Sequence, residues 1–267
     1  MKRGSEMTAE KATAQEDTRK VAFAKVLAIQ IIAYVVLVAL ALVPGMMYGD
    51  AAKPAAVPFT IIASLAMVVL LVVFSPFRDG VAGHVIAAIA GLLSAICATT
   101  VMLGNVIFPA GLDGGKSFSM EEAWIAGVGG LLIVLIIVSF GRQMARENRT
   151  HLIRSLSHSV VEGVAMIASA GWCFLPVLLP TTHSKAAAMS AASGATVDMF
   201  SNVTTTWVVA AIVTVLVAVA LTVCSYFWHR DADPEPDARS PWIGLALLPV
   251  MLTGLAVGLA ALAIVVL

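Results

Sequence analysis

The sequence predicts an all-α integral membrane protein, a bundle of about seven transmembrane helices. Hydrophobic residues make up 60% of the 267 residues and charged residues only 12%, whereas a soluble domain carries about a quarter charged residues. The charges are clustered, and long uncharged runs separate the clusters. Because roughly 20 helical residues cross the hydrocarbon core, these runs are read as membrane spans. The formal net charge of zero gives no field that would attract nucleic acid.

Seven apolar runs follow one another along the chain, and boundary residues support several of them. Ser119 and Glu122 have the spacing of a capping box before the fourth run, and Pro241 suits the first turn of the last one. Trp124 and Trp242 fit the level of the lipid headgroups. The spans are expected at about residues 26–47, 57–75, 81–108, 123–140, 159–180, 204–228 and 242–266.

The domain organisation is simple. Residues 1–24 lack apolar periodicity and are expected to form a disordered cytoplasmic tail. Residues 25–267 are expected to form a single transmembrane domain. The apolar core of the first span exceeds the roughly 7–15 residues of a signal peptide, so we interpret it as a retained span.

The distribution of Lys and Arg predicts the orientation. Of the 16 basic residues, thirteen fall on one side: six in the N-terminal segment, one at 76–80, four at 142–154 and two at 229–240. Lys53, Lys116 and Lys185 are left for the other side. The positive-inside rule therefore predicts a cytoplasmic N-terminus and an external C-terminus. We expect the cell (inner) membrane of a bacterium, because the Ala, Val, Leu and Gly usage is common in high-GC bacteria.

Three span ends resemble one another. The second, fourth and sixth spans end in LVVFSPFRDG, LIIVSFGRQMAR and LTVCSYFWHRD, each with an apolar run, Ser, an aromatic residue and Arg. One interpretation is a leading helix followed by three helical hairpins that turn on the cytoplasmic side. The alternative is that any helix leaving the membrane meets an aromatic belt and then a basic loop.

Four arginines lie between the fourth and fifth spans. If the fourth helix continues past Gly141, Arg142, Arg146 and Arg149 share one face, and Arg154 follows nearby. Guanidinium groups match phosphate geometry, so these residues could contact an anionic lipid or a lipid-linked phosphate. The alternative is topological, because positive charge alone keeps this loop inside.

A polar cluster is predicted just inside the fifth span. Glu162 follows His158 by one helical turn, and His84 sits at a similar depth in the first turn of the third span. An ionisable group inside a membrane is a functional candidate by default, so we expect Glu162 to face the interior with His158 as first partner and His84 as second. The alternative is structural, because the start of a helix favours a carboxylate. The HxxxE spacing is weak evidence for a metal, and no metal site is predicted.

Small residues and prolines mark close packing and bends. Gly254 and Gly258 form a GxxxG pair that suits helix packing, either within the chain or against a partner or second copy. Pro176 and Pro249 fall inside spans and are expected to kink them, which exposes carbonyls that a cavity could use.

Absent motifs narrow the function. The chain has no GxxxxGK[ST] loop, GxGxxG turn or HExxH motif, which argues against nucleotide, dinucleotide or zincin chemistry. No cofactor is predicted, and an enzyme is the less favoured reading. We expect a transport or cell-envelope assembly component that handles a lipid or small solute. The alternatives are a scaffold or accessory subunit of a larger complex, and a membrane-embedded enzyme that acts on a lipid-linked phosphate.

Overall fold

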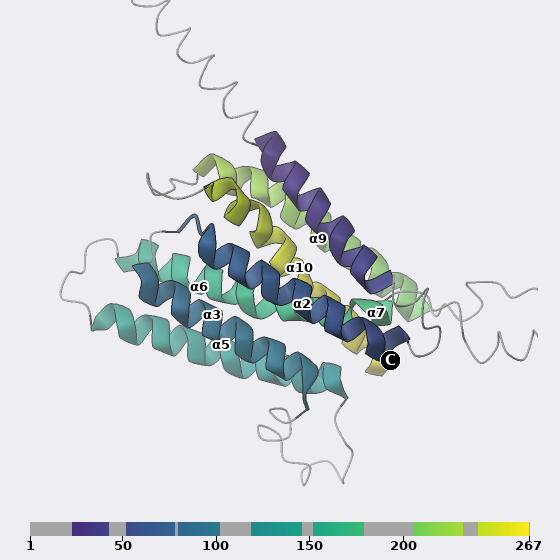
Figure 1. The fold of residues 1–267 in the computed structure, drawn as a ribbon. Coiled ribbons are helices and arrows are strands. Elements are labelled where there is room, and N and C mark those ends of the chain that lie inside the picture. Colours follow the sequence, from purple (N-terminus) through teal and green to yellow (C-terminus); the bar gives the residue numbers. More distant parts are fainter. Residues whose placement is uncertain are drawn as a thin grey trace, which may run out of the picture.

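A computed structural model describes residues 23–42, 52–77, 80–101, 119–145, 152–178, 205–231 and 240–266, and within these ranges every regular element is a helix. The predicted tail lies outside the described residues except for its last two, which are already helical. Figure 1 shows a bundle in which the helices run up and down in alternation. The elements are the first helix Phe23–Leu42, α2 Ala52–Val73, α3 Gly80–Thr99, α5 Met120–Met144, α6 Leu152–Ser169, the 3-10 helix η2 Ala170–Phe174, α7 Leu175–Leu178, α9 Thr205–Asp231 and α10 Pro241–Val266.

The chain is a multi-pass helical membrane protein. Six described helices are long and apolar enough to cross a membrane, and α6, η2 and α7 together make one of them. The remaining predicted span, the second, corresponds to α2, whose apolar part, Pro58–Val73, is shorter. The outward faces stay apolar, because residues such as Ile137 and Leu216 are more than 60% exposed. Such surfaces are stable only against lipid or another apolar partner.

The third span is shorter than predicted. α3 ends at Thr99 rather than near residue 108. The hydroxyls of Thr99 and Thr100 donate back to the carbonyl of Ile96, at 3.1 and 2.8 Å. The Thr100 backbone N–H donates to the same carbonyl at 2.9 Å, and residues 102–108 of the predicted span lie outside the described residues.

The helices fall into two groups that meet at α10 (Figure 1). The first helix packs with α9 and α10, while α3 lies between α5 and α6. The predicted hairpins α2–α3, α5–α6 and α9–α10 are each in contact. Because α3 also packs on α5 and α6, however, the hairpins are not independent units. We call the end of the bundle where Lys25, Trp242 and Arg142 lie the Lys25 end, and the other the opposite end.

Local capping follows the sequence at two helix starts. The Ser119 hydroxyl accepts from the Glu122 backbone N–H at 3.2 Å, and the Glu122 carboxylate accepts from the Ser119 N–H at 2.7 Å. This is the predicted capping box at the start of α5. Pro241 begins α10 as expected. Trp124, predicted at the headgroup level, is instead fully buried and donates to the Ser94 hydroxyl at 3.1 Å.

The predicted GxxxG pair packs inside the chain. A side chain at Gly254 would meet the carbonyl of Ala168, and one at Gly258 would meet the ring of Trp124. Both glycines are buried, so this face is already occupied and does not form the surface for a partner or second copy that the spacing suggested. Close approach of the backbones is the role that these glycines have here.

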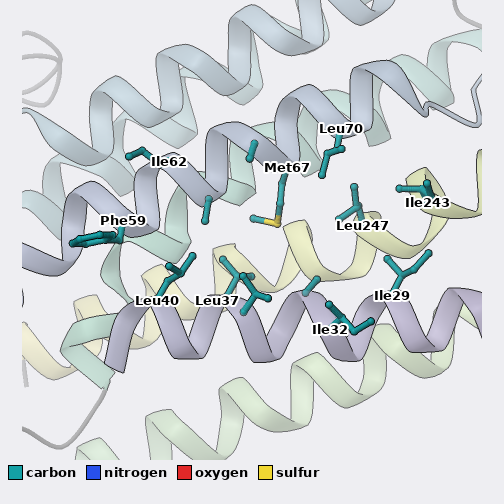
Figure 2. A pocket seen from close by; sticks show the side chains of 14 residues that line it. Ile29, Ile32, Leu37, Leu40, Phe59, Ile62, Met67, Leu70, Ile243 and Leu247 are labelled. Atoms are coloured by element: carbon teal, nitrogen blue, oxygen red, sulfur yellow. The ribbon is translucent and has the colours of Figure 1, made fainter. Parts of the chain in front are cut away.

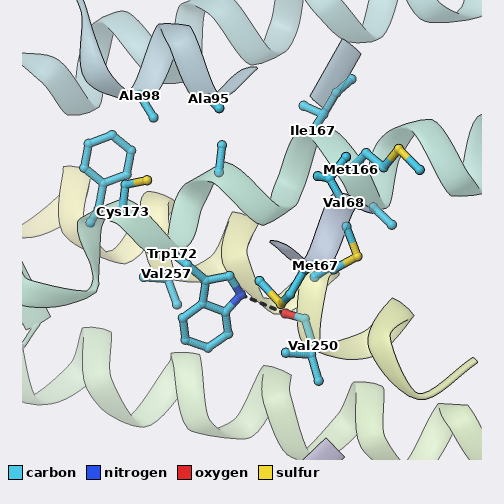
Figure 3. Packing of buried hydrophobic residues seen from close by; sticks show 14 of the residues in the cluster. Met67, Val68, Ala95, Ala98, Met166, Ile167, Trp172, Cys173, Val250 and Val257 are labelled. Carbon is cyan, nitrogen blue, oxygen red and sulfur yellow. Dashed lines mark hydrogen bonds between the residues drawn. The ribbon is translucent and has the colours of Figure 1, made fainter. Parts of the chain in front are cut away.

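The two prolines act differently. Pro176 lacks an N–H, and the segment just before it tightens into η2. α10 stays helical through Pro249, and the carbonyls around it find side-chain donors. Thr253 donates to the Pro249 carbonyl at 2.8 Å, and the Trp172 indole donates to the Val250 carbonyl at 2.9 Å (Figure 3). These contacts fix η2 against α10 in the centre of the core.

Candidate functional site

The structure brings two ionisable side chains together inside the bundle. Glu162 on α6 is fully buried, and both of its carboxylate oxygens lie at hydrogen-bond distance from Nδ1 of His84 on α3, at 2.8 and 2.9 Å. The His84 side chain is 19% exposed, so the pair touches the surface through the imidazole. His84 is four residues from the start of α3, about 6 Å along the helix axis. The pair therefore lies about one turn inside the Lys25 end.

A single ring nitrogen of His84, Nδ1, lies close to both oxygens of the Glu162 carboxylate. When the carboxylate is ionised it can only accept hydrogen bonds, so in that state Nδ1–H donates to it. A carboxylate removed from water needs such a partner, because an unpaired buried charge is strongly destabilising.

Packing of α3 against α6 positions the pair. A side chain at Gly91 would lie 2.9 Å from Cβ of Met166, so the glycine lets the two backbones approach. Three residues further along α3, the Ser94 hydroxyl donates to the Ile167 carbonyl at 2.8 Å. These contacts fix the register of the two helices, and at their Lys25 end that register sets His84 opposite Glu162.

The interior position of Glu162 agrees with the sequence prediction, but the order of partners changes. His84, which the sequence placed second, is the residue at hydrogen-bond distance from the carboxylate. His158 lies one turn before Glu162 on α6, and its ring packs against Phe77, with 4.8 Å between the ring centroids and 37° between the planes. Sequence spacing identifies neighbours on one helix, whereas the closer partner comes from a helix 78 residues away.

The four arginines are only partly covered by the described residues. α5 does continue past Gly141 to Met144, which places Arg142 half-buried in its last turn at the Lys25 end. Arg154 lies on the first turn of α6, where side chains are not described, and Arg146 and Arg149 lie outside the described residues. A shared basic face that contacts anionic lipid remains a prediction.

Sequence reasoning missed a further set of buried polar side chains near the same end. Ser139 and Gln143 on α5 and Ser159 on α6 are each at most 5% exposed. The hydroxyls of Ser139 and Ser159 have no hydrogen-bond partner in the described part of the chain. Buried hydroxyls of this kind normally bind a protein group, water or a ligand. The signal in the sequence was polar residues one turn apart, Ser139 and Gln143, at the end of an apolar run.

The pair of side chains at this site is suited to proton exchange. Among the described residues, no three His, Cys, Asp or Glu side chains lie close enough together to hold a metal ion. His84 and Glu162 carry no net charge either as an ion pair or as a neutral pair, so a proton can move between them without leaving a net charge inside the bundle. Such a pair can change the strength of the α3–α6 contact when it gains or loses a proton.

Comparison of the chain with models of protein families, with curated proteins and with solved structures finds no match.

Proposed function

We propose that this chain is a transport or cell-envelope assembly component that handles a lipid or small solute, with the His84–Glu162 pair as its proton-responsive element. The observation that carries the proposal is the fully buried carboxylate of Glu162 on the imidazole of His84, inside a bundle of apolar helices. Ionisable side chains in membrane spans are rare and mark proton relays and substrate pathways.

The position of the pair suits a switch. It joins α3 and α6, two neighbouring helices that also meet at Gly91 and through the hydrogen bond from Ser94 to the Ile167 carbonyl. Loss of the charge on either group removes the strongest contact between the helices at the Lys25 end, because charge-assisted hydrogen bonds are about twice as strong as neutral ones. The hydroxyls of Ser139 and Ser159, which have no hydrogen-bond partner among the described residues, supply polar groups for water near this end.

A scaffold is the second candidate, and one observation favours it. α9 is covered mainly by α10 and the first helix, and a long apolar face that includes Ile212, Leu216 and Val223 is exposed. This face could bind another membrane protein. A scaffold needs no response to protons, which separates the two candidates.

The distance between α3 and α6 as a function of pH tests the proposal. The three cysteines are changed to alanine, spin labels are placed at exposed Val81 and Val161, and the distance between the labels is measured in vesicles from pH 5 to pH 8. We expect the distance distribution to change with pH in the parent chain and to stay constant in Glu162→Gln, which keeps the shape but cannot ionise.

The matched control is Glu121→Gln, the same chemical change in the first turn of α5 at the opposite end. It should respond to pH as the parent does. A parent chain that shows no pH response, or a Glu162→Gln chain that responds as strongly as the parent, would contradict the proposal and favour the scaffold.

A further inference from the structure

An apolar groove opens on the side of the bundle, between the first helix and α2 (Figure 2). Its volume is about 440 Å³, within the range of about 300–1,000 Å³ that small-molecule sites have. Ile29, Ile32 and Leu40 of the first helix face Phe59 and Met67 of α2 across it, and α10 forms its floor with Ile243 and Leu247.

We propose that this groove holds an acyl chain of an anionic membrane phospholipid, whose headgroup lies at Lys25. The inference deepens the proposed function by naming a lipid as the substrate class, and for that role it rests on the proposed function. The binding itself is argued from the groove alone.

The lining matches a hydrocarbon chain. All fourteen lining side chains are apolar, so nothing in the groove would hydrogen-bond a polar ligand. Ile29 and Leu40 are eleven residues apart on the first helix, which is about 16 Å along its axis. This length is about half of the roughly 30 Å hydrocarbon core, or the depth of one leaflet. The groove also runs along the helices, the direction in which acyl chains lie.

The Lys25 end of the groove supplies a headgroup site. Lys25 lies one turn before Ile29 on the same helix face, and Trp242 directly precedes Ile243 on α10. The Lys25 ammonium is 5.6 Å from the centroid of the Trp242 ring, a cation–π distance that holds the charge at this mouth. Tryptophan prefers the headgroup level, and lysine near the surface attracts anionic lipids.

A transmembrane helix from a partner or a second copy fits less well. Such a helix is a cylinder about 10 Å across, whereas the groove lies between two helices of the same bundle with α10 as its floor. Small side chains on both walls, Ala33 and Ala63, leave space for a thin, flexible occupant. An acyl chain has that shape.

Spin-labelled lipids in vesicles test the inference on the full chain. Electron paramagnetic resonance measures the fraction of labelled phosphatidylglycerol, and separately of labelled phosphatidylcholine, that the protein immobilises. The variant Ala66→Phe places a large side chain on the exposed lip of the groove, and Ala220→Phe is the matched control on the lipid-facing side of α9. We expect Ala66→Phe to lose the tightly immobilised lipid, about one molecule per chain, and Ala220→Phe to keep it.

The variant Lys25→Gln tests the headgroup. We expect its preference for phosphatidylglycerol over phosphatidylcholine to fall about fivefold, the effect of one basic residue near the surface. Equal lipid retention in Ala66→Phe and Ala220→Phe overturns the groove, and an unchanged preference in Lys25→Gln overturns the anionic headgroup. If Ala66→Phe changes the oligomeric state in light scattering while lipid retention is unchanged, a protein helix occupies the groove and the inference is wrong.

Glu162→Gln separates this inference from the proposed function. It leaves the groove intact and should retain lipid as the parent does, even where the pH response of α3 and α6 is lost. If the parent chain retains lipid but shows no pH response, lipid binding in the groove is supported and the proton switch is refuted. If it responds to pH but retains no lipid, the proton switch is supported and lipid binding in the groove is refuted.

Discussion

The contact between His84 and Glu162 should dominate the stability of the α3–α6 interface at the Lys25 end. At 2.8 Å, the Coulomb attraction of an ion pair with an effective dielectric constant of 20 is about 6 kcal/mol before desolvation. Removal of one partner leaves the other buried and unpaired, which costs about 3–5 kcal/mol. We therefore expect His84→Ala to lower the free energy of unfolding by about that amount, towards the lower value because the imidazole is 19% exposed.

The same change should matter far less once the carboxylate is gone. In the Glu162→Gln background, His84→Ala removes only an ordinary hydrogen bond, which contributes about 1 kcal/mol. The coupling energy from the double-mutant cycle is thus expected at about 2–4 kcal/mol. Denaturant titration in detergent micelles measures all four chains. His84→Ala combined with Glu121→Gln is the control cycle, and it should be additive within about 0.5 kcal/mol. A coupling energy for His84 and Glu162 as small as that of the control would refute the buried ion pair.

Two further predictions concern packing and topology. Gly171→Ala places a methyl group on the backbone carbonyl of Gly254, which cannot move aside as a side chain could. We therefore expect the free energy of unfolding to fall by about 1–3 kcal/mol or more in the same titration. Gly129→Ala is the control: its methyl group meets no atom within 4 Å, so it should leave the stability unchanged or raise it slightly. Reporter fusions near residues 78, 148 and 235 should report the cytoplasm and those near 52, 115 and 190 the outside, as the charge asymmetry predicts; one loop on the wrong side contradicts the seven-span arrangement.

Much of the architecture could be predicted from the sequence, because a membrane span is a local property of about 20 residues. Hydropathy and caps therefore located the helices, and the cost of a lipid-facing carboxylate placed Glu162 inside. Pairing between helices is not local. The choice of His84 over His158 depends on the approach of α3 and α6 at Gly91, and the burial of Trp124 depends on Ser94. No periodicity in a single run carries that information.

The end of α3 illustrates the same limit at a smaller scale. Residues beyond Thr99 are still apolar, so hydropathy extended the span to about residue 108. At the boundary, the hydroxyls of two adjacent threonines donate to a carbonyl of the last turn, a local contact that hydropathy does not register. The groove could not be predicted from the sequence either. It forms where the first helix and α2 face each other over α10, and no sequence motif marks it.

The polar contacts of the first helix have a consequence for biosynthesis. Its Gln30 donates to Ser225 on α9 at 3.0 Å, and its Tyr34 shares a hydrogen bond with Thr253 on α10 at 2.9 Å, across 195 and 219 residues of chain. The helix Phe23–Leu42 thus meets these polar partners only after α9 and α10, which follow it in the chain, have been inserted. Until then an amide and a phenol stand in the bilayer without those partners, at a cost that favours retention by the insertion machinery. Docking of the helix Phe23–Leu42 should accordingly wait for α9 and α10, and a chain truncated before α9 should be retained and degraded.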